Sequence, residues 1–242
     1  MQVVPVIDVK NGTVVHAEGG DRRNYRPLIS SLADGSTPIR VVEGLLSVQR
    51  FSVLYIADLD AIAGHASNAQ AVAEISRHFP DLELWIDNGS HDETGVAKLL
   101  SYPAARAVIG SETLQSVRDL EQMSAHHPGR VLLSMDFRGD ELLGPQDLLQ
   151  QPQSWPSTVI AMTLAAVGSR AGPDLNWIGR LKSLAPQTAI AAAGGIRDKA
   201  DLAAAAAAGA SAALVATALH AGTLKAGDLQ EIAGLPVGSS SS

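Results

Sequence analysis

Eight short apolar runs, each followed by a longer segment with a helical pattern, constrain the fold of this chain more than any other feature. Most of the runs lack polar alternation, which is typical of strands covered on both faces. Strand and helix patterns that alternate from end to end predict a parallel sheet with crossover helices. Eight such units in 242 residues predict one (β/α)₈ TIM barrel. The expected strands are Val3–Ile7, Val53–Ala57, Leu82–Ile86, Ala107–Ile109, Val131–Met135, Val159–Met162, Ala189–Ala193 and Ala212–Val215.

The helical segments are expected to cover the outside of this barrel. Asp198 is expected to cap the seventh helix and Gly209 to end it. The fifth helical segment has the weakest helical pattern, because several prolines lie next to it. We expect a single barrel domain over residues 1–237 and a disordered tail over 238–242. The expected helices are Pro38–Arg50, Asn68–His78, Asp92–Leu100, Leu114–His126, Gln146–Gln150, Leu175–Leu184, Lys199–Ala208 and Ala226–Ala233.

A weak internal repeat favours a barrel made of two half-barrels. The pairs Gly89 with Gly195 and Gly110 with Ala216 are each 106 residues apart. Asp8 and Asp136 are farther apart, which a long insertion after the first strand explains. Chance similarity among eight apolar strands would give a similar pattern, so the repeat only supports the barrel.

Four of the eight expected strands end in a carboxylate, at the rim where barrel enzymes carry their chemistry. These residues are Asp8, Asp58, Asp87 and Asp136. A single aspartate at a strand end is more often a helix cap or a turn residue. Four aspartates around one rim indicate a functional site, because clustered like charges are unfavourable unless a ligand or a proton offsets them. In the half-barrel scheme Asp8 and Asp136 face each other, an arrangement suited to one acid and one base.

Small residues after the seventh and eighth strands predict a phosphate site. Gly194 and Gly195 expose backbone amides, and Ala216 and Thr217 begin a turn that allows close approach. Phosphate sites recur at this place in barrels. A plain Gly-Gly turn is the alternative. Gly110 and Ser111 could form a second, weaker site on the opposite side of the barrel.

Composition narrows the function classes. The net charge of −7 argues against a nucleic-acid partner. The chain has no cysteine, which excludes disulfides and thiolate metal sites. No apolar run approaches the ~20 residues of a membrane span, and the first residues do not resemble a signal peptide. We expect a cytoplasmic protein, a monomer or small homo-oligomer, with no metal site.

Several motifs resemble the barrels of histidine biosynthesis, the HisA/HisF family. Two residues favour the isomerase (HisA) branch. One is Asp8 at the first strand end, where the cyclase branch has cysteine, and the other is Thr163. That resemblance implies that Asp8 is a general base assisted by Asp136 and Thr163. The reaction would convert an aminoaldose to an aminoketose without a metal or organic cofactor. The matching segments are Val4–Gly12, Gly20–Asp21, Ala57–Asp60, Ile109–Gly110, Ser134–Asp136, Ala193–Ile196 and Val215–Leu219.

Two departures from the isomerase pattern affect the expected substrate. The isomerase holds a second phosphate with a glycine run after its third strand, where this chain has Asp87-Asn88-Gly89, and a carboxylate would repel phosphate. The isomerase's general acid after Thr163 matches Gly168, which is no acid. Further candidates for substrate contact are Lys10, Asp58, Asp87, Gly110 and Ser111.

Together these features predict a HisA-like paralogue that acts on a phosphorylated small molecule by isomerase- or lyase-type acid/base chemistry. We expect a reaction outside the standard histidine pathway. Paralogues of this kind also occur near genes for one-carbon cofactor biosynthesis. Two alternatives stay open: a true ProFAR isomerase that uses Asp136 as its acid, and a non-catalytic barrel that binds a phosphometabolite.

Overall fold

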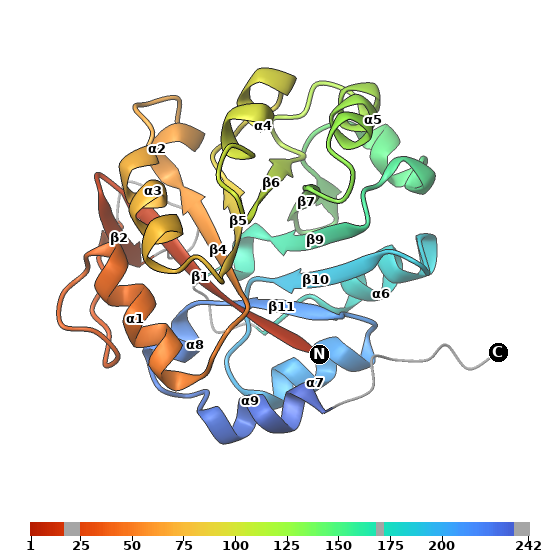
Figure 1. Ribbon diagram of the computed structural model, residues 1–242. Coiled ribbons are helices and arrows are strands. Elements are labelled where there is room, and N and C mark those ends of the chain that lie inside the picture. The colour runs from red at the N-terminus through yellow and green to blue at the C-terminus, as the bar shows by residue number, and fades with distance from the viewer. Residues whose placement is uncertain (17–24, 168–171, 235–242) are drawn as a thin grey trace.

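The computed structural model describes residues 1–16, 25–167 and 172–234. Eight parallel strands form one sheet that closes on itself where β1 pairs with β11 (Figure 1). The predicted barrel is therefore confirmed, and each expected strand is present. Going round the barrel, the strands are β1 Gln2–Lys10, β4 Val53–Asp58, β5 Glu83–Asp87, β6 Ala105–Gly110, β7 Val131–Arg138, β9 Thr158–Thr163, β10 Ala189–Ala193 and β11 Ala212–Val215.

Helices surround the barrel in the described residues, as Figure 1 shows. The capping aspartate Asp198 accepts a hydrogen bond from the backbone N–H of Asp201, as predicted, and Gly209 adopts a left-handed backbone just beyond the helix end. The outer helices are α1 Pro38–Val48, α3 Ala69–His78, α4 Glu93–Leu99, α5 Val117–His126, α6 Leu175–Leu184, α7 Lys199–Ala207 and α9 Ala226–Ala233.

Two of the expected helices differ from the structure. The segment expected over Gln146–Gln150 is only a 3₁₀ turn, η1 Gln146–Leu149, and a second turn, η2 Pro152–Ser154, follows it. The prolines around it interrupt regular helical hydrogen bonding. The helix expected from Leu114 begins at Val117, because the side chain of Ser116 caps it.

The core has two layers, one inside the barrel and one between the barrel and the helices. Inside, aliphatic side chains are joined by Tyr55 and Trp85. In the outer layer Phe137 of β7 stacks on Trp177 of α6, with ring centroids 3.8 Å apart. Side chains alternate between the two layers along each strand, so neighbouring residues at a strand end face different environments.

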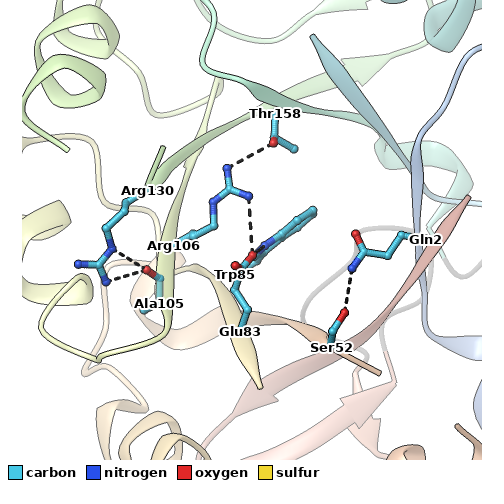
Figure 2. A network of polar contacts seen from close by, with 8 residues as sticks. All are labelled: Gln2, Ser52, Glu83, Trp85, Ala105, Arg106, Arg130 and Thr158. Carbon is cyan, nitrogen blue, oxygen red and sulfur yellow. Dashed lines mark hydrogen bonds and ion pairs between the residues drawn. The ribbon is translucent and has the colours of Figure 1, made fainter. Parts of the chain in front are cut away.

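A polar network closes the barrel at the start of the strands (Figure 2). The indole N–H of Trp85 donates to Glu83 at 2.6 Å, and Arg106 lies 3.7 Å from the same carboxylate oxygen. Arg106 also donates to Thr158 at 3.3 Å, while its Nε atom is buried without a hydrogen-bond partner among the described residues. A smaller cavity of about 330 Å³ lies beside this network, with Trp85 and Arg106 in its wall.

The opposite end carries elements that the sequence did not predict. A hairpin, β2 Thr13–His16 with β3 Arg26–Pro27, extends the sheet beyond β1. Short elements also follow individual strands: α2 Leu59–Ile62, β8 Glu141–Leu142, η3 Leu164–Ala166 and α8 Thr217–His220. The described residues contain no helix long and apolar enough to cross a membrane. The predicted tail over 238–242 lies outside the described residues.

Candidate active site

A cavity of about 680 Å³ opens at the carboxyl ends of the strands. All eight barrel strands or the residues that directly follow them contribute to its wall. The sequence predicted a site at this end, and eight of the predicted site residues line the cavity: Asp8, Asp87, Gly110, Asp136, Gly194, Gly195, Ala216 and Thr217.

Asp136, at the end of β7, is the carboxyl group in this cavity whose pKa is best suited to proton transfer. Its carboxylate is buried and accepts a hydrogen bond from the Ser134 hydroxyl at 2.9 Å. Burial, and next the charge of Asp87, raise the pKa of Asp136 to about 7, although the Ser134 hydrogen bond opposes them. A carboxyl group with a pKa near neutrality can donate or accept a proton under working conditions.

Gly110 and Ser111 of the β6 end support Asp136. The backbone N–H of Asp136 donates to the Ser111 hydroxyl oxygen at 2.9 Å, and Ser111 is fully buried. A methyl group at Gly110 would lie 3.3 Å from an Asp136 carboxylate oxygen. Ser111 was predicted to contact substrate, but it does not line the cavity. Its position favours holding Asp136 in place.

Asp87, at the end of β5, is close to the buried Tyr55. The Tyr55 hydroxyl donates to the Asp87 carboxylate at 3.1 Å. Burial raises the pKa of Tyr55 well above its ordinary value, and the charges of Asp87, Asp136 and Asp8 raise it further. The charges of these three carboxylates therefore all raise the pKa of the same hydroxyl group. Tyr55 stays protonated and is a hydrogen-bond donor next to them.

Asp8 lies on the far side of the ring from Asp136. It belongs to β1, which is four strands away from β7 in either direction around the closed sheet. Its Cα pairs with Val15 on one side and Ala57 on the other. The predicted placement of Asp8 and Asp136 across the barrel from each other is the observed one.

Asp58 has a different environment from the other strand-end carboxylates. It is 1% exposed and accepts hydrogen bonds from the backbone of Ala61 and from the Ser67 hydroxyl. Both the backbone and the side-chain amide of Asn68 also donate to it. Asp58 does not line the cavity, and its hydrogen bonds favour a role in anchoring the segment after β4 over the predicted substrate contact.

Thr163 and Lys10 also lie away from the cavity wall. Thr163 pairs with Phe137, whose ring packs in the outer layer, whereas the neighbouring Met162 pairs with Asp136. The strand alternation thus turns Thr163 away from Asp136. Lys10 pairs with Thr13 in the β1–β2 hairpin. These placements do not support the roles expected for the two residues. Gly168 lies outside the described residues.

Gly194 and Gly195 line the cavity after β10, and their backbone requires glycine. Both have positive φ angles, +95° and +82°. A Cβ on Gly194 would lie 2.7 Å from the Thr163 carbonyl oxygen, and one on Gly195 would overlap the backbone of Gly172. Glycine here lets the β10 turn pack against the segment after β9. The packing accounts for the pair without a ligand, so phosphate binding stays a prediction.

Several residues in the wall carried no signal in the sequence. His16 of β2 and His220 of α8 line the cavity, as do Glu112 and Arg138. Sequence reasoning missed them because they belong to the hairpin, to a one-turn helix and to positions beyond the expected strand ends. The described residues contain no group of three or more histidine, aspartate or glutamate side chains arranged for a metal ion.

Comparison with known proteins agrees with this architecture. The model of the family described as "Histidine biosynthesis protein" matches residues 2–225. The chain belongs to this family. Within it, the chain is a HisA-like barrel, since its named relatives are isomerases.

Three relatives illustrate how similar the chain is to known proteins. An uncharacterized protein of Methanocaldococcus jannaschii is 29% identical, over 96% of this chain and 97% of that protein. The ProFAR isomerase of Myxococcus xanthus is 27% identical, over 93% and 96%. Phosphoribosyl isomerase A of Streptomyces coelicolor is 25% identical, over 91% and 93%. The similarity thus extends over nearly whole chains at low identity.

Proposed function

We propose that this chain is an acid/base isomerase for a small molecule with one phosphate group, and that its substrate differs from that of ProFAR isomerase. One observation carries the proposal. Asp8 and Asp136 line the same cavity from opposite strands, while Asp87 stands where the isomerase resemblance implies a second phosphate. The charge of Asp87 disfavours a second anion at that strand end.

The chemistry would be an aldose–ketose type rearrangement. Asp136 in its protonated form donates a proton to the ring oxygen, and the C1–O bond of the ring breaks to give a protonated imine between C1 and the nitrogen. Asp8 then removes the proton from C2; the C2–H electron pair forms the C1–C2 double bond, and the C1–N π electrons return to the nitrogen as a lone pair. Asp8 returns a proton to C1 while the C2 hydroxyl gives up its proton to Asp136, which leaves a ketone at C2 and restores both carboxyl groups. No electrons are gained or lost overall, so no redox partner is needed.

The phosphate of the substrate is assigned to the turns after β10 and β11. Gly194, Gly195, Ala216 and Thr217 all line the cavity, and the carboxylates Asp8, Asp87 and Asp136 come from other strands. The first N–H groups of α8 have no partner within that helix, so they can donate to an oxyanion. A phosphate held there would orient the sugar toward Asp8 and Asp136.

The standard ProFAR reaction is the second candidate. The relatives named above favour it, and the pKa of Asp136 near 7 suits a general acid. In that case Asp136 would replace the acid that the family carries at the position of Gly168.

Two measurements separate the candidates. We expect the chain not to restore growth of a histidine auxotroph that lacks the isomerase, and the purified protein to turn over ProFAR poorly. ProFAR would be held by one phosphate instead of two, because Asp87 stands at the second phosphate position, and loss of substrate orientation can cost on the order of 10²-fold in rate. A turnover number near the ~10 s⁻¹ of a median enzyme would establish the standard reaction instead.

A non-catalytic binding protein would behave differently in one further test. Metabolites that co-purify with the protein can be identified by mass spectrometry and returned to fresh enzyme. Conversion of such a monophosphate to an isomer of the same mass is expected. Release of the unchanged compound, with Asp8→Asn binding it equally well, would favour a binding protein.

A further inference from the structure

His220 occupies a position in the cavity wall that the proposed mechanism does not use. It is the last residue of α8, the single helical turn that starts directly after Ala216. Thr217 and His220 are three residues apart on this turn, so their side chains share one face. His220 is 7% exposed and lines the cavity together with Thr217.

The ring of His220 is held by the segment that leads into α1. Its Nδ1 atom lies 3.0 Å from the Ser30 hydroxyl oxygen. That oxygen already accepts a hydrogen bond from the backbone N–H of Leu32 at 3.1 Å. The hydroxyl proton of Ser30 therefore needs an acceptor, and Nδ1 is within reach. We assign Ser30 as the donor and Nδ1 as the acceptor, which leaves the ring proton on Nε2.

The main chain of His220 is fixed as well. Its carbonyl oxygen accepts hydrogen bonds from the backbone N–H of Ser31 at 3.3 Å and from the Ser31 hydroxyl at 3.1 Å. Contacts from Ser30 and Ser31 thus restrain both the ring and the backbone. The Nε2 atom has no hydrogen-bond partner in the part of the chain that the structure describes. It is the ring nitrogen left for a ligand.

The electrostatic environment keeps this imidazole neutral. Burial, and next the charge of the nearby His16 of β2, lower the pKa of His220 to about 4. Around neutral pH the ring therefore carries one N–H donor and no charge. A neutral N–H donor on a ring that is held in place, in a residue that lines the cavity, is suited to an oxyanion.

We propose that the Nε2–H group of His220 donates a hydrogen bond to the phosphoryl group of the ligand. This inference rests on the phosphate site of the proposed function and adds a side chain to it. The site then combines the backbone amides of two glycines with one neutral imidazole. Ser30 acts as a positioning residue that selects the ring's tautomer.

The test is sulfate binding by isothermal titration calorimetry at pH 7.5, because sulfate is a dianion that does not titrate there. His220→Phe keeps a planar ring but removes the donor, and we expect about three- to tenfold weaker binding, the worth of one hydrogen bond. His220→Gln offers an amide N–H near the Nε2 position and should bind within about twofold of the original protein. His65→Gln, in an exposed loop away from the cavity, is the matched control and should change nothing.

A second readout separates ligand contact from a structural role. In ¹⁵N NMR of the imidazole groups, sulfate should shift the Nε2 signal of His220, and the signal should indicate the Nε2–H tautomer. Equal sulfate affinity of His220→Phe and the original protein, with no shift, would overturn the role of His220 alone. Absence of sulfate binding to the original protein would overturn the phosphate site and this inference together.

Discussion

The Ser111 hydroxyl oxygen accepts a hydrogen bond from the backbone N–H of Asp136 at 2.9 Å, across the β6–β7 boundary. The same hydroxyl lies 3.4 Å from the Asp136 carboxylate. Ser134 contacts the other carboxylate oxygen from within β7. Two buried serines thus fix one carboxylate whose pKa lies near 7, and the proton affinity of Asp136 depends on groups that do not line the cavity.

The first prediction concerns the pH dependence of turnover. If Asp136 is the general acid, activity falls as the pH rises through about 7, where it loses its proton. Ser134→Ala removes a hydrogen bond that lowers this pKa, so the alkaline limb should move to higher pH. Asp87→Asn removes a charge that raises it, so the limb should move to lower pH. Rate–pH profiles of kcat measure both shifts, and movement in the same direction would contradict the assignment.

The second prediction concerns stability. The pKa of Asp136 in the folded chain, about 7, is above the 3.8 of an ordinary aspartate, so the folded chain binds an extra proton between these pH values. Stability therefore decreases as the pH rises from about 4 to about 7. Asp136→Asn cannot ionise and should be more stable than the original protein at pH 8 by on the order of 1–3 kcal/mol.

Urea unfolding at pH 8 and at pH 4.5 tests this directly. The stability difference between Asp136→Asn and the original protein should shrink at the lower pH, where the original carboxyl is protonated. Asp140→Asn, an exposed change in the turn after β7, serves as the control. A variant that is less stable at pH 8 would mean that Asp136 is held mainly by its hydrogen bonds.

The barrel itself could be predicted from the sequence because apolar runs without polar alternation are typical of parallel strands buried on both faces, and eight strand–helix units in one domain are the number that a TIM barrel needs. The strand-end carboxylates could be found for the same reason, since strand ends locate the rim. Their separate roles could not. Asp58 and Asp136 follow similar apolar runs, yet one is enclosed by Asn68 and Ser67 and the other faces the cavity.

Residues that enter the site from connecting segments were missed for a different physical reason. His16 and His220 reach the cavity through a hairpin and a one-turn helix. Short elements of this kind have no hydrophobic periodicity of their own, because their positions are set by tertiary contacts such as those of Ser30 and Ser31 with His220. Thr163 shows the opposite difficulty: it stands at a strand end, but the alternation along β9 turns its side chain away from the cavity, so its position does not support the predicted role.

The third prediction concerns the polar network at the other end of the barrel (Figure 2). Arg106 is partly buried, its pKa is lowered by burial, and its Nε atom lacks a partner within the described residues. Arg106→Met keeps the length of the side chain and removes the charge, so the free energy of unfolding should change by less than about 1 kcal/mol. Arg106→Ala leaves a void beside Trp85 and should cost about 1–3 kcal/mol. Turnover per folded molecule should be unchanged in both, and a loss of turnover would show coupling to the active site.

The fourth prediction locates an anion. In crystals soaked with sulfate, we expect density at the backbone of Gly195 and Thr217, within hydrogen-bond reach of His220. The glycine turns, the start of α8 and the neutral imidazole provide donors there, whereas Asp87 repels an anion at the β5 end. Sulfate bound at Asn88 and Gly110, with the first site empty, would reverse the assignment of the two ends of the cavity.

The last prediction concerns Asp8, the proposed base. Asp8 is half-buried at the cavity wall, whereas Asp58 on the neighbouring strand is fully enclosed. Asp8→Asn should abolish turnover of the substrate that is found, while leaving the melting temperature and sulfate affinity nearly unchanged, because it alters a proton acceptor and little packing. Asp58→Asn is the matched comparison: it disturbs several buried hydrogen bonds and should cost about 1–3 kcal/mol of stability, with activity reduced only in proportion to the folded fraction. An Asp8→Asn variant that is destabilised but still active would show that Asp8 stabilises the pairing of β1 with β2. The proposed reaction would then have no base.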